Sequence, residues 1–438
     1  MVWKKEKLKP LGWFRSAGVN KKIDNNQKKV SLINYMDVYR NHQITSNINF
    51  QKATAKDAEI KNANVTFGDV LFTPSSEKPT DIGHASVVIE ELNDTVYSYH
   101  LIRFRFYNPR LFNPFFLSYL LNTYQTEKHF VKRATGTTRY TLSLSDFKSL
   151  EIEYPESLKE QTAIATILSK IDAAIEATQK SIKATEKLKK ALMQNLLNGK
   201  LKPDGTWRKE GEFYEDEKYG KVPIGWHIIK GNKITSKITK GQSPKWQGFD
   251  YQDEGILFVT SESVQNGYID IENPKYLPME FHNKIKNSQL LKGDILINIV
   301  GASIGRCTLF NLETQYANTN QAVCVFRAND ENNSIFLSYY FQEKMVQKRL
   351  LGSQVETARA NLSLGDFRKF KFIIPKSQSE QKDIGTKISS TSKIIRSKQS
   401  KIESQQRLKK SLMQHLLTGK KRVNVNKIDK HLKEQKYD

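Results

Sequence analysis

Two cysteines and eight histidines are the side chains of this sequence best suited to bind a metal or to act as nucleophiles. Cys307 and Cys324 lie 17 residues apart, and no Cys-x-x-Cys or His-x-x-x-His pair completes a tetrahedral zinc site. The histidines are scattered, and none is paired with a nucleophile. We therefore expect two buried, reduced thiols on strands of one domain and no bound metal.

Three other motifs have the composition of sites that act on nucleic acids, but each is incomplete. Asn113-Pro114-Phe115-Phe116 has the order of the Asn-Pro-Pro-Tyr/Phe loop of amino-methyltransferases without its second proline, and no glycine-rich cofactor loop precedes it. Pro203-Asp204 with Glu210 has carboxylates suited to a nuclease, but the surrounding residues predict no strands. Gly301 to Gly305 is a lone Gly-x-x-x-Gly, which favours a tight turn over a phosphate cradle. We interpret 113–116 as a helix start and predict no catalytic residue.

Net charge is the strongest signal in the composition. Seventy lysines and arginines stand against 46 acidic residues, which gives a formal net charge of +24. Such an excess repels itself unless an acidic partner neutralises it, and nucleic acid is the usual partner. The basic residues are spread along the chain, which indicates a long basic face, although a basic surface without function stays open as an alternative.

The hydropathy pattern is that of a protein outside the membrane. Mean hydropathy is -0.59, and no apolar run approaches the roughly 20 residues of a membrane helix. The N-terminus is basic but lacks the apolar core of a secretory signal. We expect a cytoplasmic protein without a membrane partner, long enough for two or three globular units.

An internal duplication organises the whole chain. Residues 155–200 align with residues 375–420 at a constant offset of 220, and 20 of the 46 positions are identical. Weaker matches lie upstream: 137–147 with 357–367 at the same offset, Gly68–Leu71 with Gly293–Leu296, and Pro10–Trp13 with Pro223–Trp226. The chain is therefore predicted to contain two halves, each a globular unit followed by a helix.

Each copy of the duplication has the start and stop signals of one long helix. Ser157 with Glu160, and Ser377 with Glu380, have the spacing of a capping box. Gly199 and Gly419 then supply the residue that ends each helix. The roughly 40 residues between these signals correspond to about 60 Å of helix.

The apolar residues of both helices recur at steps of three and four, which is the pattern of a coiled-coil seam. Polar residues dilute its middle, and these are Thr178, Thr185, Lys398 and Gln405. Two such stripes in one chain predict an antiparallel pair, with packing of each helix on its own domain as the alternative. The seam residues are Ile164, Leu168, Ile171, Ile175, Ile182, Leu192, Leu196, Ile384, Ile388, Ile395, Ile402, Leu412 and Leu416.

The globular units are rich in β-branched and aromatic runs, which predicts an α+β fold with mixed, strand-rich domains. Helices are expected at 114–126 and 335–350, and 201–222 is expected to be a linker without regular structure. The expected strands are 30–38, 85–92, 96–106, 255–261, 293–300 and 321–328. The predicted division is 1–155, 156–200, 201–222, 223–375, 376–420 and a basic tail at 421–438.

This organisation resembles the specificity subunit of Type I restriction–modification systems. The resemblance rests on the duplicated helix end Leu-Lys-Lys-x-Leu-Met-Gln-x-Leu-Leu-x-Gly-Lys at 188–200 and 408–420, and on Lys-Gly-Gln-Ser-Pro at 240–244. The first unit departs from the family pattern because it lacks the Lys-Gly-x-Ser-Pro turn and has an unusual stretch at 15–29.

The resemblance implies a role without catalysis. Residues 1–155 and 223–375 would be target recognition domains that read a bipartite, asymmetric site in double-stranded DNA, and the paired helices would space them. Two modification (methyltransferase) subunits would bind the helices and carry S-adenosylmethionine, so no cofactor is expected in this chain. Two restriction (motor-nuclease) subunits would join them.

Candidate DNA contacts are polar residues in loops near the repeated motifs. Arginine and lysine suit phosphates and guanine, and asparagine and glutamine suit adenine. In the first half they are Lys132, Arg133, Thr135, Thr137, Thr138 and Arg139. In the second half they are Lys240, Gln242, Ser243, Lys245, Ser303, Arg306, Asn318, Asn320, Gln321, Gln354 and Arg359.

Two other interpretations stay open. The chain could serve a methylation-only or other defence complex, which changes its partners and not its DNA reading. It could also be a structural coiled-coil protein whose basic charge is incidental, and this class would bind no DNA sequence specifically.

Overall fold

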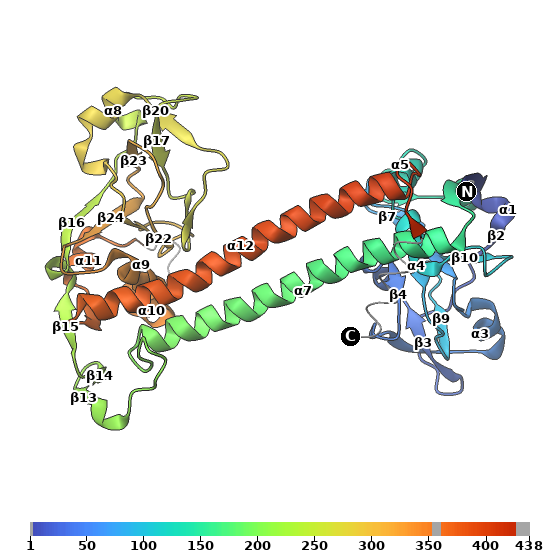
Figure 1. Cartoon of the computed structure of the whole chain (residues 1–438), viewed down its shortest axis with the longest axis horizontal. Helices are drawn as coiled ribbons and strands as arrows, with labels where there is room; N and C mark the ends of the chain where they lie inside the picture. The colour runs from blue at the N-terminus through green and yellow to red at the C-terminus, as the bar shows by residue number, and fades with distance from the viewer. Residues whose placement is uncertain (1–2, 353–360, 426–438) are drawn as a thin grey trace. The chain divides into compact units, whose positions relative to one another are not determined.

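A computed structural model of the chain describes residues 3–352 and 361–425. Its contacts form two compact units, of which unit 1 combines residues 1–178 with 401–438 and unit 2 comprises residues 179–400. Two helices of 39 residues, α7 (Leu158–Leu196) and α12 (Gln378–Leu416), belong partly to each unit (Figure 1). Within the described ranges, no helix has the length and apolarity needed to cross a membrane.

The long helices begin and end where the repeated motifs predict. The Glu160 N–H donates to Ser157 Oγ, and the Glu380 N–H donates to Ser377 Oγ, each at 3.4 Å. Gly199 and Gly419 follow the helices with φ of 73° and 68°, in the left-handed region that glycine enters without strain. The predicted capping box is only half right, because neither glutamate carboxylate is bonded to its cap residue. Both carboxylates instead accept hydrogen bonds from an arginine distant in sequence.

Both units contain an antiparallel stretch of the helix pair. In unit 1, Lys409 forms a salt bridge with Asp172 at 2.6 Å, and Thr178 Oγ1 donates to Gln405 at 3.4 Å. In unit 2, Lys398 Nζ donates to Ser181 at 2.6 Å and to Thr185 at 3.1 Å. As the residue numbers of the bonded partners increase along α7, those of their partners decrease along α12. The predicted antiparallel pairing is therefore confirmed.

Burial along the predicted seam is greatest where the helices meet the globular cores. The buried seam residues are Ile164, Leu168, Leu196, Ile384, Ile388, Ile395 and Leu416. The half-buried ones are Ile171, Ile175, Ile182, Leu192, Ile402 and Leu412. A bare helix pair covers only one stripe of each helix, which leaves these side chains partly open to solvent.

Unit 1 is built on a five-stranded sheet of order β2-β10-β6-β8-β4. A second sheet, β5-β3-β9, covers a separate smaller core. The strands of unit 1 are β1 (Trp3–Lys7), β2 (Gly12–Arg15), β3 (Lys28–Ile33), β4 (Gln43–Ile44), β5 (Gln51–Ala55), β6 (Val70–Phe72), β7 (Ser75–Ser76), β8 (Ala85–Val88), β9 (Thr95–Tyr97), β10 (Ile102–Phe106), β11 (Tyr140–Thr141) and β12 (Glu151–Pro155). Its short helices are α1 (Leu8–Leu11), α2 (Tyr35–Arg40), α3 (Asp57–Ala63), α4 (Pro114–Leu120), α5 (Tyr124–Val131) and α6 (Leu144–Lys148).

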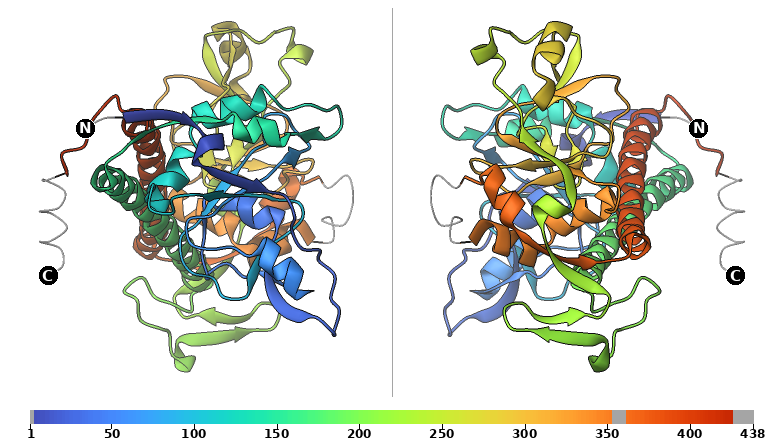
Figure 2. Two further views of the ribbon diagram at one scale, coloured as in Figure 1. Left: turned by 90° about the vertical axis from the view of Figure 1, so that its right-hand side faces the viewer. Right: turned by 90° about the vertical axis from the view of Figure 1, so that its left-hand side faces the viewer.

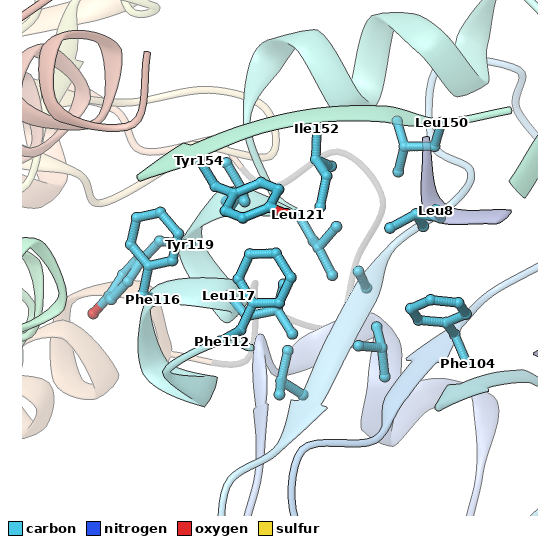
Figure 3. Packing of buried hydrophobic residues seen from close by; sticks show 14 of the residues in the cluster. Leu8, Phe104, Phe112, Phe116, Leu117, Tyr119, Leu121, Leu150, Ile152 and Tyr154 are labelled. Atoms are coloured by element: carbon cyan, nitrogen blue, oxygen red, sulfur yellow. The ribbon is translucent and has the colours of Figure 1, made fainter. Parts of the chain in front are cut away.

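The main core of unit 1 joins the sheet to both long helices. Phe104 of β10, Phe116 of α4 and Tyr154 of β12 pack together with other apolar residues, as Figure 3 shows. Ile164 of α7 and Leu416 of α12 belong to the same cluster. The C-terminal end of α12 is therefore part of the first globular core.

Unit 2 repeats this framework with the sheet β16-β24-β21-β22 and adds a distal sheet, β20-β17-β23. The distal elements lie at one end of unit 2, apart from the framework (Figure 1). The strands of unit 2 are β13 (Phe213–Asp216), β14 (Gly220–Pro223), β15 (Trp226–Lys230), β16 (Thr235–Lys240), β17 (Ile256–Val259), β18 (Val264–Gln265), β19 (Tyr268–Ile269), β20 (Lys275–Leu277), β21 (Ile295–Asn298), β22 (Cys307–Leu309), β23 (Ala317–Thr319), β24 (Val323–Ala328) and β25 (Lys371–Pro375). Its helices are η1 (Glu210–Glu212), η2 (Gly231–Lys233), η3 (Lys245–Gln247), α8 (Met279–Lys284), η4 (Lys286–Ser288), α9 (Ser334–Gln342), α10 (Lys344–Leu351) and α11 (Leu364–Lys369).

The two cysteines lie where the sequence predicts. Cys307 is on β22 and Cys324 on β24, and both are free and buried. Burial raises the pKa of both thiols well above the ordinary range, so they stay protonated.

Five predictions about local structure are wrong. The expected helices at 114–126 and 335–350 are each two helices, because Thr123 and Glu343 cap a second start. The expected strand at 30–38 ends at Ile33, since Asn34 caps α2. The expected strand at 96–106 is interrupted between β9 and β10. The expected unstructured linker at 201–222 contains most of the β13–β14 hairpin, which projects from the rest of unit 2 (Figure 1, Figure 2).

The match of Pro10–Trp13 with Pro223–Trp226 is also wrong. Trp226 opens β15 and pairs with Pro375, whereas the residue that opens β1 and pairs with Pro155 is Trp3. Trp3 is therefore the counterpart of Trp226, and Trp13 lies on β2. The shared proline, glycine and tryptophan of these two short segments were too little to align two diverged regions.

Candidate nucleic-acid interface

Three framework strands of unit 2 present their connecting loops at one edge. The Gly241 N–H donates to the Asn320 carbonyl at 3.1 Å, joining the end of β16 to the start of β24. The Ile299 N–H donates to the Ala322 carbonyl at 2.9 Å, joining the end of β21 to the same place. The Leu362 N–H reaches the Ile299 carbonyl at 2.9 Å, which adds a fourth segment. Because neighbouring strands in this sheet are antiparallel, the ends of β16 and β21 lie beside the start of β24.

Glycine at 241 is required by this meeting of loops. A Cβ there would lie 1.8 Å from the Thr319 carbonyl oxygen, inside the backbone of the neighbouring segment. The Lys-Gly-Gln-Ser-Pro motif is thus a close crossing of two chain segments. It holds the side chains that follow in a defined place.

Most of the predicted contacts of the second half lie on these loops. Lys240 ends β16, Gln242 and Ser243 follow it, and Asn320 and Gln321 precede β24. Each of these five side chains is at least partly exposed. Lys245 is exposed in η3, a few residues farther along the first loop. Gln354 and Arg359 lie outside the described residues.

The Gly301–Gly305 segment is a tight turn, as predicted. The Ile304 N–H donates to the Gly301 carbonyl at 3.0 Å, and both glycines have positive φ. Ser303 accepts from Asn298 Nδ2 at 3.1 Å, which orients its hydroxyl. Arg306 is exposed beyond the turn and donates to Gln265 at 3.1 Å.

Asn318 does not belong to this surface. Its side chain is 0% exposed and donates to Ser288 Oγ at 2.6 Å and to the Ile285 carbonyl at 3.3 Å. Its oxygen is bonded to His282 Nδ1 at 2.5 Å. With both polar atoms occupied inside the unit, Asn318 fixes the distal sheet and cannot contact DNA in this conformation.

The predicted contacts of the first half share one exposed loop after α5. Thr135 and Thr141 exchange backbone hydrogen bonds at 3.1 and 2.8 Å, which closes the loop. Arg139 Nη2 donates to Ser75 Oγ at 3.0 Å and so fastens the loop to β7. The exposed residues of the loop are Lys132, Arg133, Thr135, Thr137, Thr138 and Arg139. They combine three cations with three hydroxyls, which suits phosphate contacts.

A buried ion pair stabilises the framework sheet in each unit. Arg105 Nε and Nη2 both donate to Asp69 at 2.7 Å. Arg327 donates to Asp294 in the same bidentate way at 2.6 and 2.8 Å. The Gly-Asp repeat at 68–69 and 293–294 therefore marks a structural carboxylate, and hydrogen bonding raises the pKa of each arginine.

Each unit also has a groove beside its long helix that the seam pattern did not predict. In unit 1 the groove holds about 620 Å³ between the 122–127 segment and α12, where Lys410, Met413 and Gln414 line it. In unit 2 it holds about 510 Å³ between the 342–345 segment and α7, where Lys190, Met193 and Gln194 line it. These positions are identical in the repeat at offset 220. Lys190, Gln194 and their counterparts Lys410 and Gln414 lie off the seam. Their identity in the two copies is not explained by packing of the helix pair, and it could have indicated a second shared surface.

One lysine that lines each groove lies beside an aromatic ring. Lys409 Nζ lies 5.7 Å from the centre of the Tyr119 ring, and Lys189 Nζ lies 5.6 Å from that of Tyr339. Burial lowers the pKa of Lys189, and nearby Arg396 adds to this effect. Leu188 and Leu408, at the start of the repeated motif, are 53% and 50% exposed.

Comparison with known proteins gives a consistent result. Residues 3–187 and 215–405 match the family described as "Type I restriction modification DNA specificity domain". The chain is 27% identical over 376 residues to a putative Type I restriction enzyme MjaX specificity subunit of Methanocaldococcus jannaschii, covering 84% of this chain and 82% of that protein.

Solved structures share the fold across nearly the whole chain. The S subunit of a Type I restriction–modification system from M. genitalium superposes with a TM-score of 0.55 at 16% identity, covering 95% of this chain and 96% of that one. A chain from a study of assembly and conformational transition of the Type I R-M system superposes with a TM-score of 0.52 at 15% identity, covering 95% and 97%. Two matched domains with mixed sheets, joined by long packed helices, therefore place this chain in the family of Type I restriction–modification specificity subunits, the non-catalytic subunits that recognise DNA targets.

Proposed function

We propose that the two units read the two parts of a split, asymmetric DNA sequence. In this proposal residues 1–155 and 223–375 are the target recognition domains, and 156–200 and 376–420 are the spacer helices. Residues 201–222 connect the halves, and 421–438 form a basic tail. The supporting observation is that both halves share a framework sheet and carry exposed polar loops, at 132–139 in unit 1 and around 241, 303 and 320 in unit 2. The loop around 241 differs between the halves, because the segment after β2 lacks the Lys-Gly-Gln-Ser-Pro motif.

The chemistry of these loops separates affinity from specificity. Lys132, Arg133 and Arg139 present charge for phosphates, whose neutralisation supplies most of the salt-dependent affinity. Gln242, Asn320 and Gln321 offer amides that can hydrogen-bond in pairs to adenine. Thr137 and Arg139 recur as Thr357 and Arg359 in the repeat, so a phosphate role suits them better than base reading.

The partners follow from the duplication of the grooves. Two chemically similar grooves suit two copies of one partner, and we assign them to two modification subunits that hold S-adenosylmethionine. Two restriction subunits would complete the complex in the cytoplasm. This chain would then supply DNA recognition and a scaffold while its partners supply the chemistry.

The test is an exchange of recognition domains. Replacing residues 223–375 by the corresponding domain of another specificity subunit should change one half of the methylated sequence and leave the other half intact. Methylome sequencing of cells that carry the hybrid, with the unaltered chain as control, measures this directly. A hybrid that changes both halves together, or neither, would overturn the assignment.

A further inference from the structure

The loop that follows the Lys-Gly-Gln-Ser-Pro motif is firmly anchored on both sides. The Gln247 and Phe249 N–H groups donate to the Pro244 carbonyl at 2.8 and 3.0 Å. The Phe249 ring packs edge-on against Phe281 of α8 at 5.5 Å, and Lys284 Nζ donates to the Gln247 carbonyl at 3.2 Å. Gly241 closes the other side against Thr319. These contacts fix the conformation of the loop and hold its tip in place.

At the tip of this turn a tryptophan points into solvent. Trp246 is 84% exposed, the highest value among the exposed large apolar side chains of the described residues. Trp226, by contrast, is 2% exposed. A large aromatic ring that stays exposed on a fixed turn contributes almost no apolar burial to the folded state. Such exposure is typical of residues that contact a partner.

We propose that Trp246 packs its indole against bases of the half-site that unit 2 reads. The inference rests on the proposed DNA-reading function. Trp246 lies in the same loop as Lys240, Gln242 and Ser243, and Lys245 beside it is exposed and suited to a phosphate. Aromatic rings stack on bases or wedge into base steps, and we expect Trp246 to reach its bases only when unit 2 is docked on its own half-site, so this contact adds affinity there and favours deformable steps.

The contact belongs to one half of the molecule. In unit 1 the corresponding strand β2 ends at Arg15 and leads into Ser16-Ala17-Gly18, without the motif or a tryptophan. The effect of Trp246 should therefore be confined to the second half-site. A general stabilising role would not show that confinement.

The experiment compares DNA binding by the full chain and by Trp246→Ala. The probes are a duplex with the sequence methylated in the host and two duplexes in which either half is scrambled. Trp246→Ala should weaken binding about 5- to 100-fold on every duplex with an intact second half. It should match the unaltered chain when that half is scrambled. Trp246→Phe should keep most of the affinity.

Trp207→Ala is the matched control, because Trp207 is 60% exposed but lies in the connecting segment, and it should leave binding unchanged. DNA should also quench the tryptophan fluorescence of the unaltered chain more than that of Trp246→Phe. Unchanged DNA affinity of Trp246→Ala would overturn the inference, and weakened assembly with the methyltransferase subunits alongside it would assign the residue to a protein contact. Failure of the unaltered chain to distinguish the methylated sequence from a fully scrambled duplex would instead refute the proposed function.

Discussion

A glutamate at the start of each long helix joins segments that are far apart in the chain. Glu160 is 1% exposed and accepts from Arg422 Nε and Nη2, both at 2.6 Å. Glu380 accepts from Arg208 at 2.5 Å and from the Trp226 indole at 3.0 Å. Each arginine follows the end of the other long helix, so the ion pair ties that end to the globular core.

Removing the charge of Glu160 should therefore destabilise unit 1. We expect Glu160→Gln to lower the free energy of unfolding by about 1–3 kcal/mol, because a neutral amide cannot replace a carboxylate that accepts two hydrogen bonds from Arg422. Urea unfolding followed by circular dichroism measures this. Glu156→Gln is the control, since its exposed pair with Lys4 should contribute nothing measurable. Equal midpoints for both variants would contradict the interpretation.

At the scale of the elements, the polar middle of the helix pair specifies its register. Lys398 is bonded to Thr185, and Gln405 is bonded to Thr178. A shift of one heptad in one direction would place Gln405 opposite Ile171, and a shift the other way would place Lys398 opposite Leu192. Both polar side chains have polar partners only in the observed register. Such residues lower stability and exclude alternative alignments.

Replacing the lysine should increase stability. We expect Lys398→Leu to raise the free energy of unfolding by about 0.5–1.5 kcal/mol, because a half-buried seam position then contributes apolar contact. Lys393→Leu, at an exposed position of the same helix, should change it little. The midpoints of urea unfolding for the two variants and the unaltered chain measure this difference. A lower midpoint for Lys398→Leu than for the unaltered chain would show that the lysine amine stabilises the helix pair.

For the whole molecule, the proposed function assigns one modification subunit to each of the two grooves. The grooves beside α7 and α12 repeat the same helix residues, so one substitution should affect one partner copy. Lys410→Glu should release one modification subunit, and Lys190→Glu with Lys410→Glu should release both, because the exposed ammonium groups line the two grooves. Native mass spectrometry of the co-expressed complex counts the subunits.

Lys187→Glu provides the control for the groove variants, because Lys187 is exposed on α7 but does not line its groove. It should keep both modification subunits. If the double variant also retains both, the partners bind elsewhere on the helices.

Much of this architecture could be predicted from local patterns. The two long helices, their ends at Gly199 and Gly419, the buried thiols and the tight turn at Gly301 all depend on residues close in sequence. Pattern and propensity determine such features directly. The breaks at Thr123 and Glu343 escaped prediction, because a side-chain cap inside an apolar stretch competes with continued helix.

The sequence by itself determined that one module was duplicated, that two long helices would pair, and that the chain would carry a large net positive charge. Only the tertiary structure decided that Trp3 is the counterpart of Trp226, that Asn318 is internal, and that Glu160 binds Arg422. These outcomes depend on which distant segments meet. Periodicity and composition describe neighbours along the chain, whereas burial and ion pairing are set by contacts across it.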